Sequence, residues 1–152
     1  MISVQYILTK KQREKFLKIP IDISDWDIAK YYTFTKKELE IIGNRRRQYN
    51  KIGFALQLSA LKHPGWSYSK ARQFPLSVSK YIAQQIKVNP SEICNYPKKI
   101  ETLSEHFIQV KNFFEYRNFE KRDEDWLFDL ILELALENDN PLFLVKCAIV
   151  QI

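Results

Sequence analysis

The stretch RRRQYNKIGFALQL, residues 45–58, joins a basic head to an apolar tail. Its pattern predicts one long helix over about residues 45–62, ended by the breakers His63, Pro64 and Gly65. The wide apolar arc of the tail predicts burial in a core. Arginines are unfavourable at a helix start, because the helix dipole prefers anions there. Stability therefore does not explain the head, whereas a bound phosphate does. A solvated first turn is the alternative interpretation.

The composition is typical of a folded, helical chain. The 152 residues are 45% hydrophobic and 14% aromatic, with 3 glycines and 6 prolines. This length fits one mid-sized domain or two very small ones, and the scarcity of breakers favours helices. No alternating strand pattern competes. The expected fold class is all-α.

The charge is distributed unevenly. The net charge is +6, but residues 1–73 carry 15 Lys and Arg against 6 Asp and Glu, whereas residues 118–152 carry 3 against 8. A one-sided basic footprint favours nucleic acid or an anionic membrane surface as the partner. No apolar run approaches the roughly 20 residues of a membrane span, and we find no signal peptide. We expect a cytoplasmic protein in which Cys94 and Cys147 are buried free thiols.

Capping residues predict the other helices. Ser24 precedes a helix over residues 25–31, and Thr35 with Glu38 forms a capping box for a helix over 35–42 that Gly43 would end at C′. Thr102 and Glu105 predict a second capping box. The remaining predicted helices cover residues 10–18 (capped by Thr9), 76–87, 90–96 (capped by Asn89), 103–117, 123–137 and 141 onward.

Residues 28–42 and 82–96 resemble each other at a constant offset of 54. Each copy reads as a short helix, a turn with an apolar residue (Phe34 or Val88) and a capped helix, which is the outline of a helix-turn-helix. Basic residues follow both copies. We therefore expect two tandem helix-turn-helix subdomains, residues 1–66 and 67–118, followed by an acidic helical segment, residues 119–152.

Charged and amide side chains of both copies are the candidate DNA contacts. Phosphates attract lysine and arginine, and amides can read base edges. Gln84 and Gln85 are weaker candidates, since exposed glutamines are common. The candidate site residues are Lys36, Lys37, Arg45, Arg46, Arg47, Asn50, Lys51, Ser91, Asn95, Lys98 and Lys99.

The aromatic residues and histidines are expected to have structural roles. Core packing is favoured over stacking on bases for Trp26, Tyr31, Tyr32, Phe34, Trp126, Phe128 and Phe143, and with them for Leu130, Ile131 and Leu134. His106 has no neighbouring nucleophile and is expected to pack or form a hydrogen bond, while His63 is expected at a helix end. Without a glycine-rich phosphate loop or a metal-ligand cluster, we expect no catalytic residue, metal site or cofactor.

The run from Arg45 to Gly65 resembles the N-terminal region of class II replicative transposases, the Tn-three family. The shared pattern is a basic cluster, then Asn50, Ile52, the hexapeptide GFALQL and Pro64-Gly65. The stretches LTKKQREKFLKIP, YIAQQIKVNPSEICNY and TLSEHFIQVKNFF are also similar to that family. The resemblance therefore spans essentially the whole chain.

The resemblance implies a function. The N-terminal part of such transposases recognises the terminal inverted repeats of the transposon as double-stranded DNA, and tandem subdomains like those of centromere protein B would suit it. A distant DDE-type catalytic domain, absent from these 152 residues, would cut and join DNA. The expected location is the bacterial cytoplasm, at the nucleoid when bound, with self-association in the full-length protein. The alternatives are a helical protein-interaction or dimerisation domain and a stand-alone transcription regulator.

Overall fold

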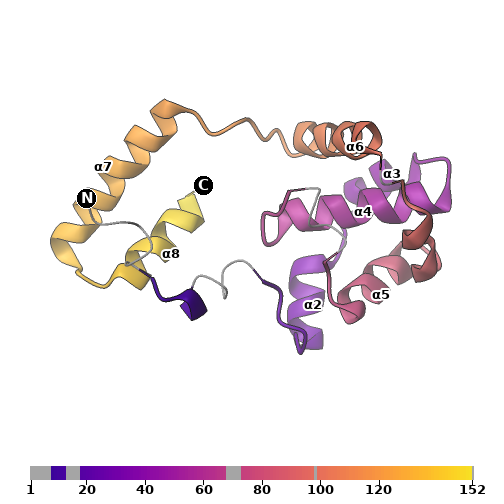
Figure 1. Ribbon diagram of the computed structural model, residues 1–152, viewed down its shortest axis with the longest axis horizontal. Helices are drawn as coiled ribbons and strands as arrows, with labels where there is room; N and C mark the ends of the chain where they lie inside the picture. The colour runs from indigo at the N-terminus through magenta and orange to yellow at the C-terminus, as the bar shows by residue number, and fades with distance from the viewer. Residues whose placement is uncertain (1–7, 13–17, 68–72, 98, 152) are drawn as a thin grey trace. The chain divides into compact units, whose positions relative to one another are not determined.

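The computed structural model describes residues 8–12, 18–67, 73–97 and 99–151 (Figure 1). All regular elements in those ranges are helices, and no strand occurs in them, which confirms the all-α fold class. The chain divides into two compact units. The larger unit comprises residues 18–116, and the smaller unit includes residues 117–152.

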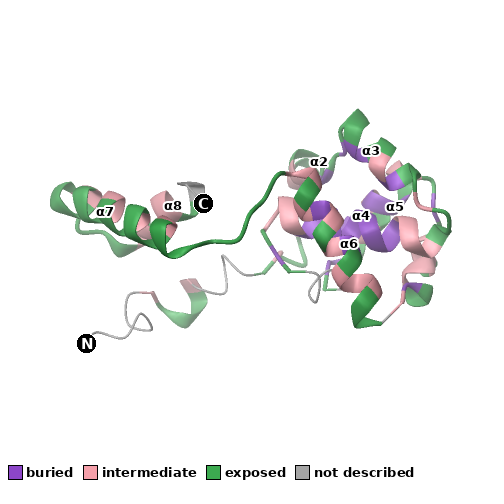
Figure 2. Cartoon of the chain, turned by 90° about the horizontal axis from the view of Figure 1, so that it is seen from above, coloured by how far each residue is buried: buried purple, intermediate pink, exposed green. Residues whose placement is uncertain are grey.

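The larger unit is built around one central helix. Its elements are α2 (Asp25–Tyr32), α3 (Lys36–Gly43), α4 (Gln48–Lys62), α5 (Leu76–Gln85), the 3-10 helix η3 (Pro90–Asn95) and α6 (Ile100–Phe113). Helix α4 packs against α3, α5, η3 and α6, and α2 packs against α5. Figure 2 shows the buried residues concentrated in α4, as expected for the element that the others enclose.

The apolar tail of the opening stretch forms the core. Residues 52–60 of α4 are all buried, and the side chains of Phe54, Leu56 and Leu58 are almost completely inaccessible. A helix buried on every side needs apolar or small residues around its whole circumference. The sequence IGFALQLSA meets this requirement, with Gln57 as its one amide. The predicted burial of the tail is confirmed.

The helix pair α2–α3 follows its predicted caps. The Ser24 side chain accepts a hydrogen bond from the Asp27 backbone N–H, and Thr35 and Glu38 form the reciprocal capping box. Phe34 in the turn is buried, as predicted for a residue that fills the angle between the two helices. Thr9 also caps as predicted, since its Oγ1 accepts from the Gln12 backbone N–H at 3.2 Å.

The predicted start of α4 is wrong. Gly43 is the last residue of α3 rather than its C′ residue, and Asn44 keeps a right-handed helical backbone (φ −67°, ψ −8°). Arg47 is extended (φ −112°, ψ 144°), and α4 begins only at Gln48. The three arginines thus form the connection between α3 and α4, and Arg47 occupies the N-cap position of α4.

The second copy of the sequence repeat differs from the first. Helix α5 is followed, after residues 86–89, by a 3-10 helix rather than an α-helix, with Asn89 capping it as predicted. Ala83 is fully buried, whereas its counterpart Ala29 is exposed. Because the copies differ in helix type and in burial, the tandem helix-turn-helix arrangement and the division at residue 66 stay predictions.

The predicted capping box of Thr102 and Glu105 does not form. Helix α6 already begins at Ile100, with Lys99 at its N-cap position. The backbone of Thr102 is therefore helical, whereas an N-cap residue is extended. The helix also ends at Phe113, four residues earlier than predicted.

The smaller unit contains α7 (Lys121–Glu137) and α8 (Pro141–Gln151), which pack against each other. Helix α7 begins two residues before the predicted position, because Glu120 caps it in a box with Asp123. The Arg117 guanidinium hydrogen-bonds both oxygens of Asp123, which keeps the pKa of that carboxyl well below its usual range. Arg117, which precedes α7 in the sequence, therefore stabilises the N-terminus of that helix.

Several predicted core residues are at the surface. Trp126, Phe128 and Phe143 are exposed, and α7 contains no fully buried residue, because a helix paired with one neighbour has only one covered face. Leu130, Ile131 and Leu134 are half-buried. Trp26 is 69% exposed, since α2 turns the opposite side of its helix, with Ile28 and Tyr32, to the core. Cys94 is exposed on η3 and Cys147 is half-buried, so neither is the buried thiol predicted.

Candidate nucleic-acid interface

The three arginines of the α3–α4 connection have different environments. Arg46 and Arg47 are exposed, whereas Arg45 is half-buried. The Arg45 guanidinium lies 4.3 Å from the centre of the Phe54 ring and donates to the Gln109 side chain of α6. Such stacking of a cation on an aromatic face stabilises the fold. Arg45 therefore joins α4 to α6, and Arg46 and Arg47 are the two exposed cations of the connection.

The first turn of α4 adds two predicted residues beside this pair. Asn50 and Lys51 are both half-buried. The Oδ1 atom of Asn50 is shielded from solvent and has no hydrogen-bond partner in the described ranges, so this atom is not offered to DNA. Arg46 and Arg47 do not share a helix face with Asn50, because both arginines precede the helix.

The residue Tyr96, which follows η3, fixes that element against α4. A Cβ atom added to Gly53 would lie 2.2 Å from the Tyr96 ring, so only glycine lets the two elements approach this closely. The Tyr96 hydroxyl accepts a hydrogen bond from the Gln57 side chain at 2.8 Å and lies 2.7 Å from Nδ1 of His106. The tautomer of His106 decides which atom donates in this second hydrogen bond, and in either case the bond links the residue after η3 to α6.

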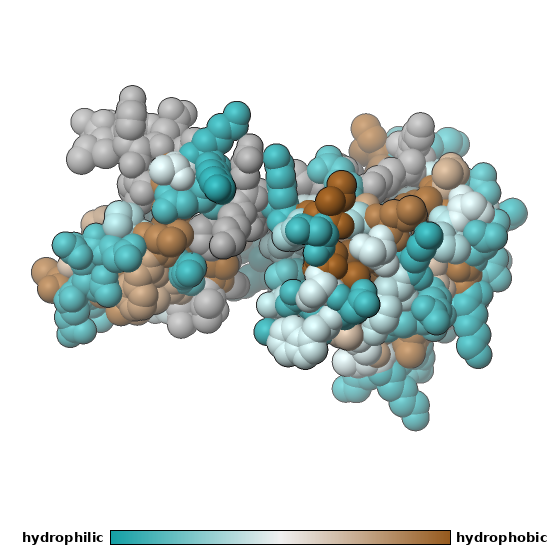
Figure 3. Space-filling model, turned by 90° about the horizontal axis from the view of Figure 1, so that it is seen from below, coloured by the Kyte–Doolittle hydropathy of each residue, from teal (hydrophilic) through white to brown (hydrophobic). Residues whose placement is uncertain are grey.

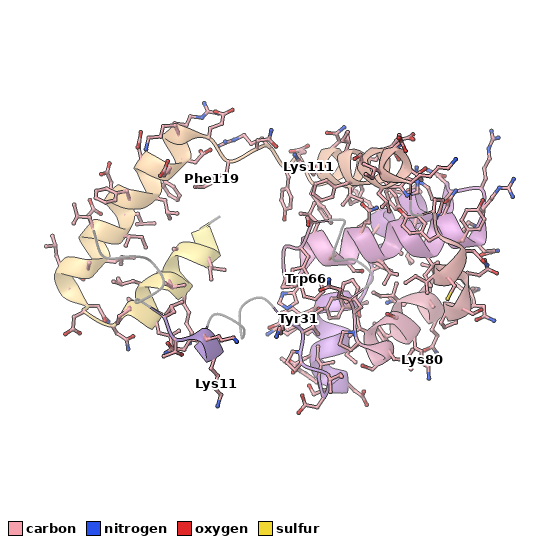
Figure 4. All side chains as sticks on the ribbon, viewed as in Figure 1. Lys11, Tyr31, Trp66, Lys80, Lys111 and Phe119 are labelled. Carbon is pink, nitrogen blue, oxygen red and sulfur yellow. The ribbon has the colours of Figure 1, made fainter. Side chains whose placement is uncertain are left out.

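This contact places the predicted residues of η3 at the end of the larger unit where the arginines connect α3 to α4. Ser91 and Asn95 are exposed on η3, and Figure 1 shows η3 and the start of α4 at the same end of the larger unit. Long side chains with nitrogen tips project from that end in Figure 4. Both polar residues form hydrogen bonds with near neighbours in the sequence. The backbone N–H and the hydroxyl of Ser91 donate to Oδ1 of Asn89, and the Asn95 side-chain amide donates to Glu92.

Lys36 and Lys37 lie apart from the arginine pair. Both are exposed in the first turn of α3, as predicted, whereas the arginines follow its last turn. An eight-residue helix separates the two groups by about 12 Å, at 1.5 Å per residue. Lys99 is exposed at the α6 N-cap position, and Lys98 lies outside the described residues.

Two long-range contacts that stabilise the α2–α3 pair were not predicted from the sequence. Gln85 of α5, a weak candidate for base reading, instead donates to the Tyr32 carbonyl at 2.9 Å and accepts from the Phe34 N–H at 2.8 Å, which holds the turn between α2 and α3. Lys62 forms an ion pair with the buried Glu38 at 3.0 Å, in addition to the capping role of that glutamate. Sequence spacing does not predict either contact, because the partners are 24 to 53 residues apart in the sequence.

The predicted histidine roles are confirmed. His106 is buried against Phe54 and Tyr96, and burial lowers its pKa, with the charge of Arg45 acting in the same direction. His63 stands at the C-cap of α4 and stacks on Tyr31 with ring centres 4.0 Å apart.

The family model described as "Domain of unknown function (DUF4158)" matches residues 7–152. The chain belongs to the DUF4158 family. The match covers nearly all of the chain and thus includes both compact units.

The relatives of this DUF4158 chain are transposases. It is 38% identical over 139 residues to the transposase of transposon Tn1546 from Enterococcus faecium, which covers 91% of the chain. It is 30% identical to the Tn501 transposase of Pseudomonas aeruginosa and 32% identical to the Tn21 transposase of Escherichia coli, in both cases over 94% of the chain. These matches confirm the resemblance to the N-terminal region of Tn-three family transposases. The chain spans 14% of the length of each of these three relatives.

In the ranges that the structure describes, no helix of this DUF4158 chain is long and apolar enough to cross a membrane. Within the same ranges, no group of three His, Cys, Asp or Glu side chains is placed to hold a metal ion.

Proposed function

We propose that this chain is the DNA-binding region of a transposase and that it recognises the terminal inverted repeats of its transposon. The observation that carries the proposal is the α3–α4 connection of this chain, whose relatives are transposases. There, Arg46 and Arg47 are exposed beside the N-terminus of α4, while Arg45 fastens the connection to the core.

The electrostatics of this position favour a phosphate group. The free backbone N–H groups of a helix N-terminus carry partial positive charge, and guanidinium groups add charged, forked hydrogen bonds. Residues 18–116 carry 16 Lys and Arg against 9 Asp and Glu. The larger unit therefore has a net positive charge, which attracts a polyanion, and the arginine pair is a local concentration of that charge.

Phosphate contacts alone carry no sequence information, so recognition of a repeat requires base contacts. The exposed polar residues of η3, Ser91 and Asn95, are suited to this role because Tyr96 fixes η3 against α4. We assign phosphate contacts to Arg46, Arg47 and Lys99 and base contacts to Ser91 and Asn95. Lys36 and Lys37 would reach a phosphate further along the duplex.

The test is a binding titration with two DNA duplexes of equal length. One carries the terminal sequence of the element that encodes the chain, and the other a scrambled sequence of the same composition. The proposal predicts that the terminal duplex binds roughly 10³-fold more tightly or better at physiological salt. Equal affinity for the two duplexes would show sequence-independent binding and would refute recognition of the repeats.

A further inference from the structure

Helix α7 of the smaller unit has two apolar faces. One consists of Leu127, Leu130, Ile131 and Leu134, which are half-buried in the unit that α7 forms with α8. The other consists of Phe128, Leu132 and Leu136, which are 66%, 52% and 82% exposed. We call these three residues the exposed stripe. Successive members are four residues apart, so they form a continuous row along the helix.

The exposed stripe is a contiguous row of apolar side chains rather than a set of scattered exposed ones. Single exposed apolar residues are common in proteins, but a contiguous apolar row on a helix marks an interaction surface. Figure 3 shows apolar side chains open at the surface of the smaller unit among hydrophilic ones. Rows with a spacing of i and i+4 are the pattern through which amphipathic helices pair.

Acidic residues define what the stripe can bind. Asp129, Glu133 and Glu137 each follow a stripe residue directly, about 100° further around the helix, and all three are exposed. They line one edge of the stripe as a parallel row of carboxylates. Residues 117–152 carry 4 Lys and Arg against 8 Asp and Glu. This charge repels DNA and anionic membrane surfaces and attracts a cationic partner.

We propose that the exposed stripe docks a basic amphipathic helix of a partner protein. The partner helix presents apolar side chains at a spacing of four residues to Phe128, Leu132 and Leu136. Lysine or arginine residues along one edge of that helix pair with Asp129, Glu133 and Glu137. The proposal concerns only the smaller unit and does not depend on the DNA-binding function proposed for the larger one.

The experiment uses the full 152-residue chain and two synthetic helical peptides. Both peptides have leucines at every fourth position, and one carries lysines along one edge where the other carries glutamates. Fluorescence anisotropy of the labelled peptides measures their affinity. We expect saturable binding of the lysine peptide, at least about tenfold tighter than that of the glutamate peptide, because hot-spot contacts and complementary charge act together.

Variants locate the binding surface. Replacing Leu132→Gln and Leu136→Gln together should weaken binding of the lysine peptide about tenfold or more, which is the effect expected for central apolar contacts. The matched control is Ile21→Gln with Leu76→Gln, two exposed apolar residues of the larger unit, and it should leave binding unchanged. Both changes replace surface residues, so circular dichroism should show the same helix content in each variant.

Three results would overturn the proposal. Equal binding of both peptides would remove the charge argument. Unchanged affinity of the Leu132→Gln, Leu136→Gln variant would show that the stripe is not the binding surface. A dimer of the chain in sedimentation equilibrium that this variant dissolves would show that a second copy covers the stripe instead of a partner helix.

Discussion

At the scale of single residues, identical side chains in one run have different tasks. Arg45 stacks on Phe54 and bonds to Gln109, while Arg46 and Arg47 are exposed. The sequence predicts the same role for all three arginines, because they share a charge and are adjacent. Sequence spacing does not distinguish them, since the contacts of Arg45 are with residues 9 and 64 positions away.

The double variant Arg46→Ala, Arg47→Ala is expected to lose DNA affinity and keep its stability. Each lost hydrogen bond between a guanidinium and a phosphate should cost about 1.5–3 kcal/mol of binding free energy. The free energy of unfolding should change little, because exposed charges contribute at most about 1 kcal/mol. Anisotropy titrations with the terminal duplex and urea unfolding measure the two quantities.

The charge-matched control for this variant is Lys121→Ala with Arg122→Ala, two exposed cations of α7. It removes the same net charge from the acidic unit and should leave DNA affinity nearly unchanged. A loss of affinity equal to that of the Arg46, Arg47 variant would mean that only the total charge matters. Early melting of the Arg46, Arg47 variant would mean that these residues belong to the fold.

Acidification is expected to destabilise the larger unit through His106. Burial lowers the pKa of His106, so the unfolded chain, with a pKa of about 6.5, binds the proton more readily. The free energy of unfolding is therefore highest above about pH 6.5 and falls as the pH drops from there toward the folded pKa. Urea unfolding at about pH 7.5 and pH 5.5 measures this difference.

The variant His106→Gln should show a smaller loss of stability between the same two pH values. The remaining loss is assigned to His63, whose pKa burial also lowers. An unchanged pH dependence in His106→Gln would contradict the assignment of the effect to His106.

At the scale of elements, the sequence predicts the features that depend on local hydrogen bonds and on periodicity, such as helices and their caps. The caps Ser24, Thr35 and Asn89 were predicted correctly, because each bonds to a backbone N–H within three residues. The start of α4 was missed, because the backbone of Asn44 stays helical and α3 runs closer to the arginines than the glycine signal indicated. The 3-10 geometry of η3 was also missed.

Long-range contacts account for what the sequence could not show at this scale. The contact of Gly53 with Tyr96 spans 43 positions and fixes η3 against α4. The sequence therefore predicts the candidate residues but not which of them lie close together. Only the fold shows that Ser91 and Asn95 lie at the end of the unit where α4 begins, and that Lys36 and Lys37 are set apart.

The variant Gly53→Ala is expected to destabilise the larger unit, although alanine favours helix formation. The new Cβ would lie 2.2 Å from the Tyr96 ring and would displace it. Overpacking of this kind costs about 1–3 kcal/mol, which exceeds the roughly 0.5–1 kcal/mol that alanine gains over glycine in a helix. Urea unfolding gives the net change, and DNA titration shows whether η3 has moved.

Gly43→Ala in α3 is the matched control. No atom lies within 4 Å of a Cβ added there, and the backbone of Gly43 is not in the left-handed region. This variant should be neutral or stabilised by up to about 1 kcal/mol. If Gly53→Ala and Gly43→Ala were equally stable, the close approach of Tyr96 would not constrain the fold.

At the scale of the whole molecule, the two units have opposite charge. Residues 18–116 have an excess of lysine and arginine, and residues 117–152 an excess of aspartate and glutamate. This separation was visible in the sequence and agrees with the boundary between the compact units at residues 116 and 117. It suits a molecule that binds a polyanion with one unit and a cationic partner with the other.

The salt dependence of DNA binding tests the central claim that Arg46 and Arg47 contact phosphates. If six to eight phosphates are neutralised, the logarithm of the binding constant should fall with the logarithm of the salt concentration with a slope of roughly −5 to −7. The Arg46→Ala, Arg47→Ala variant should show a slope less steep by about 1.8, because each lost phosphate contact removes about 0.9. The Lys121→Ala, Arg122→Ala control should keep the wild-type slope. A double arginine variant with the wild-type slope would contradict the claim, whatever its affinity.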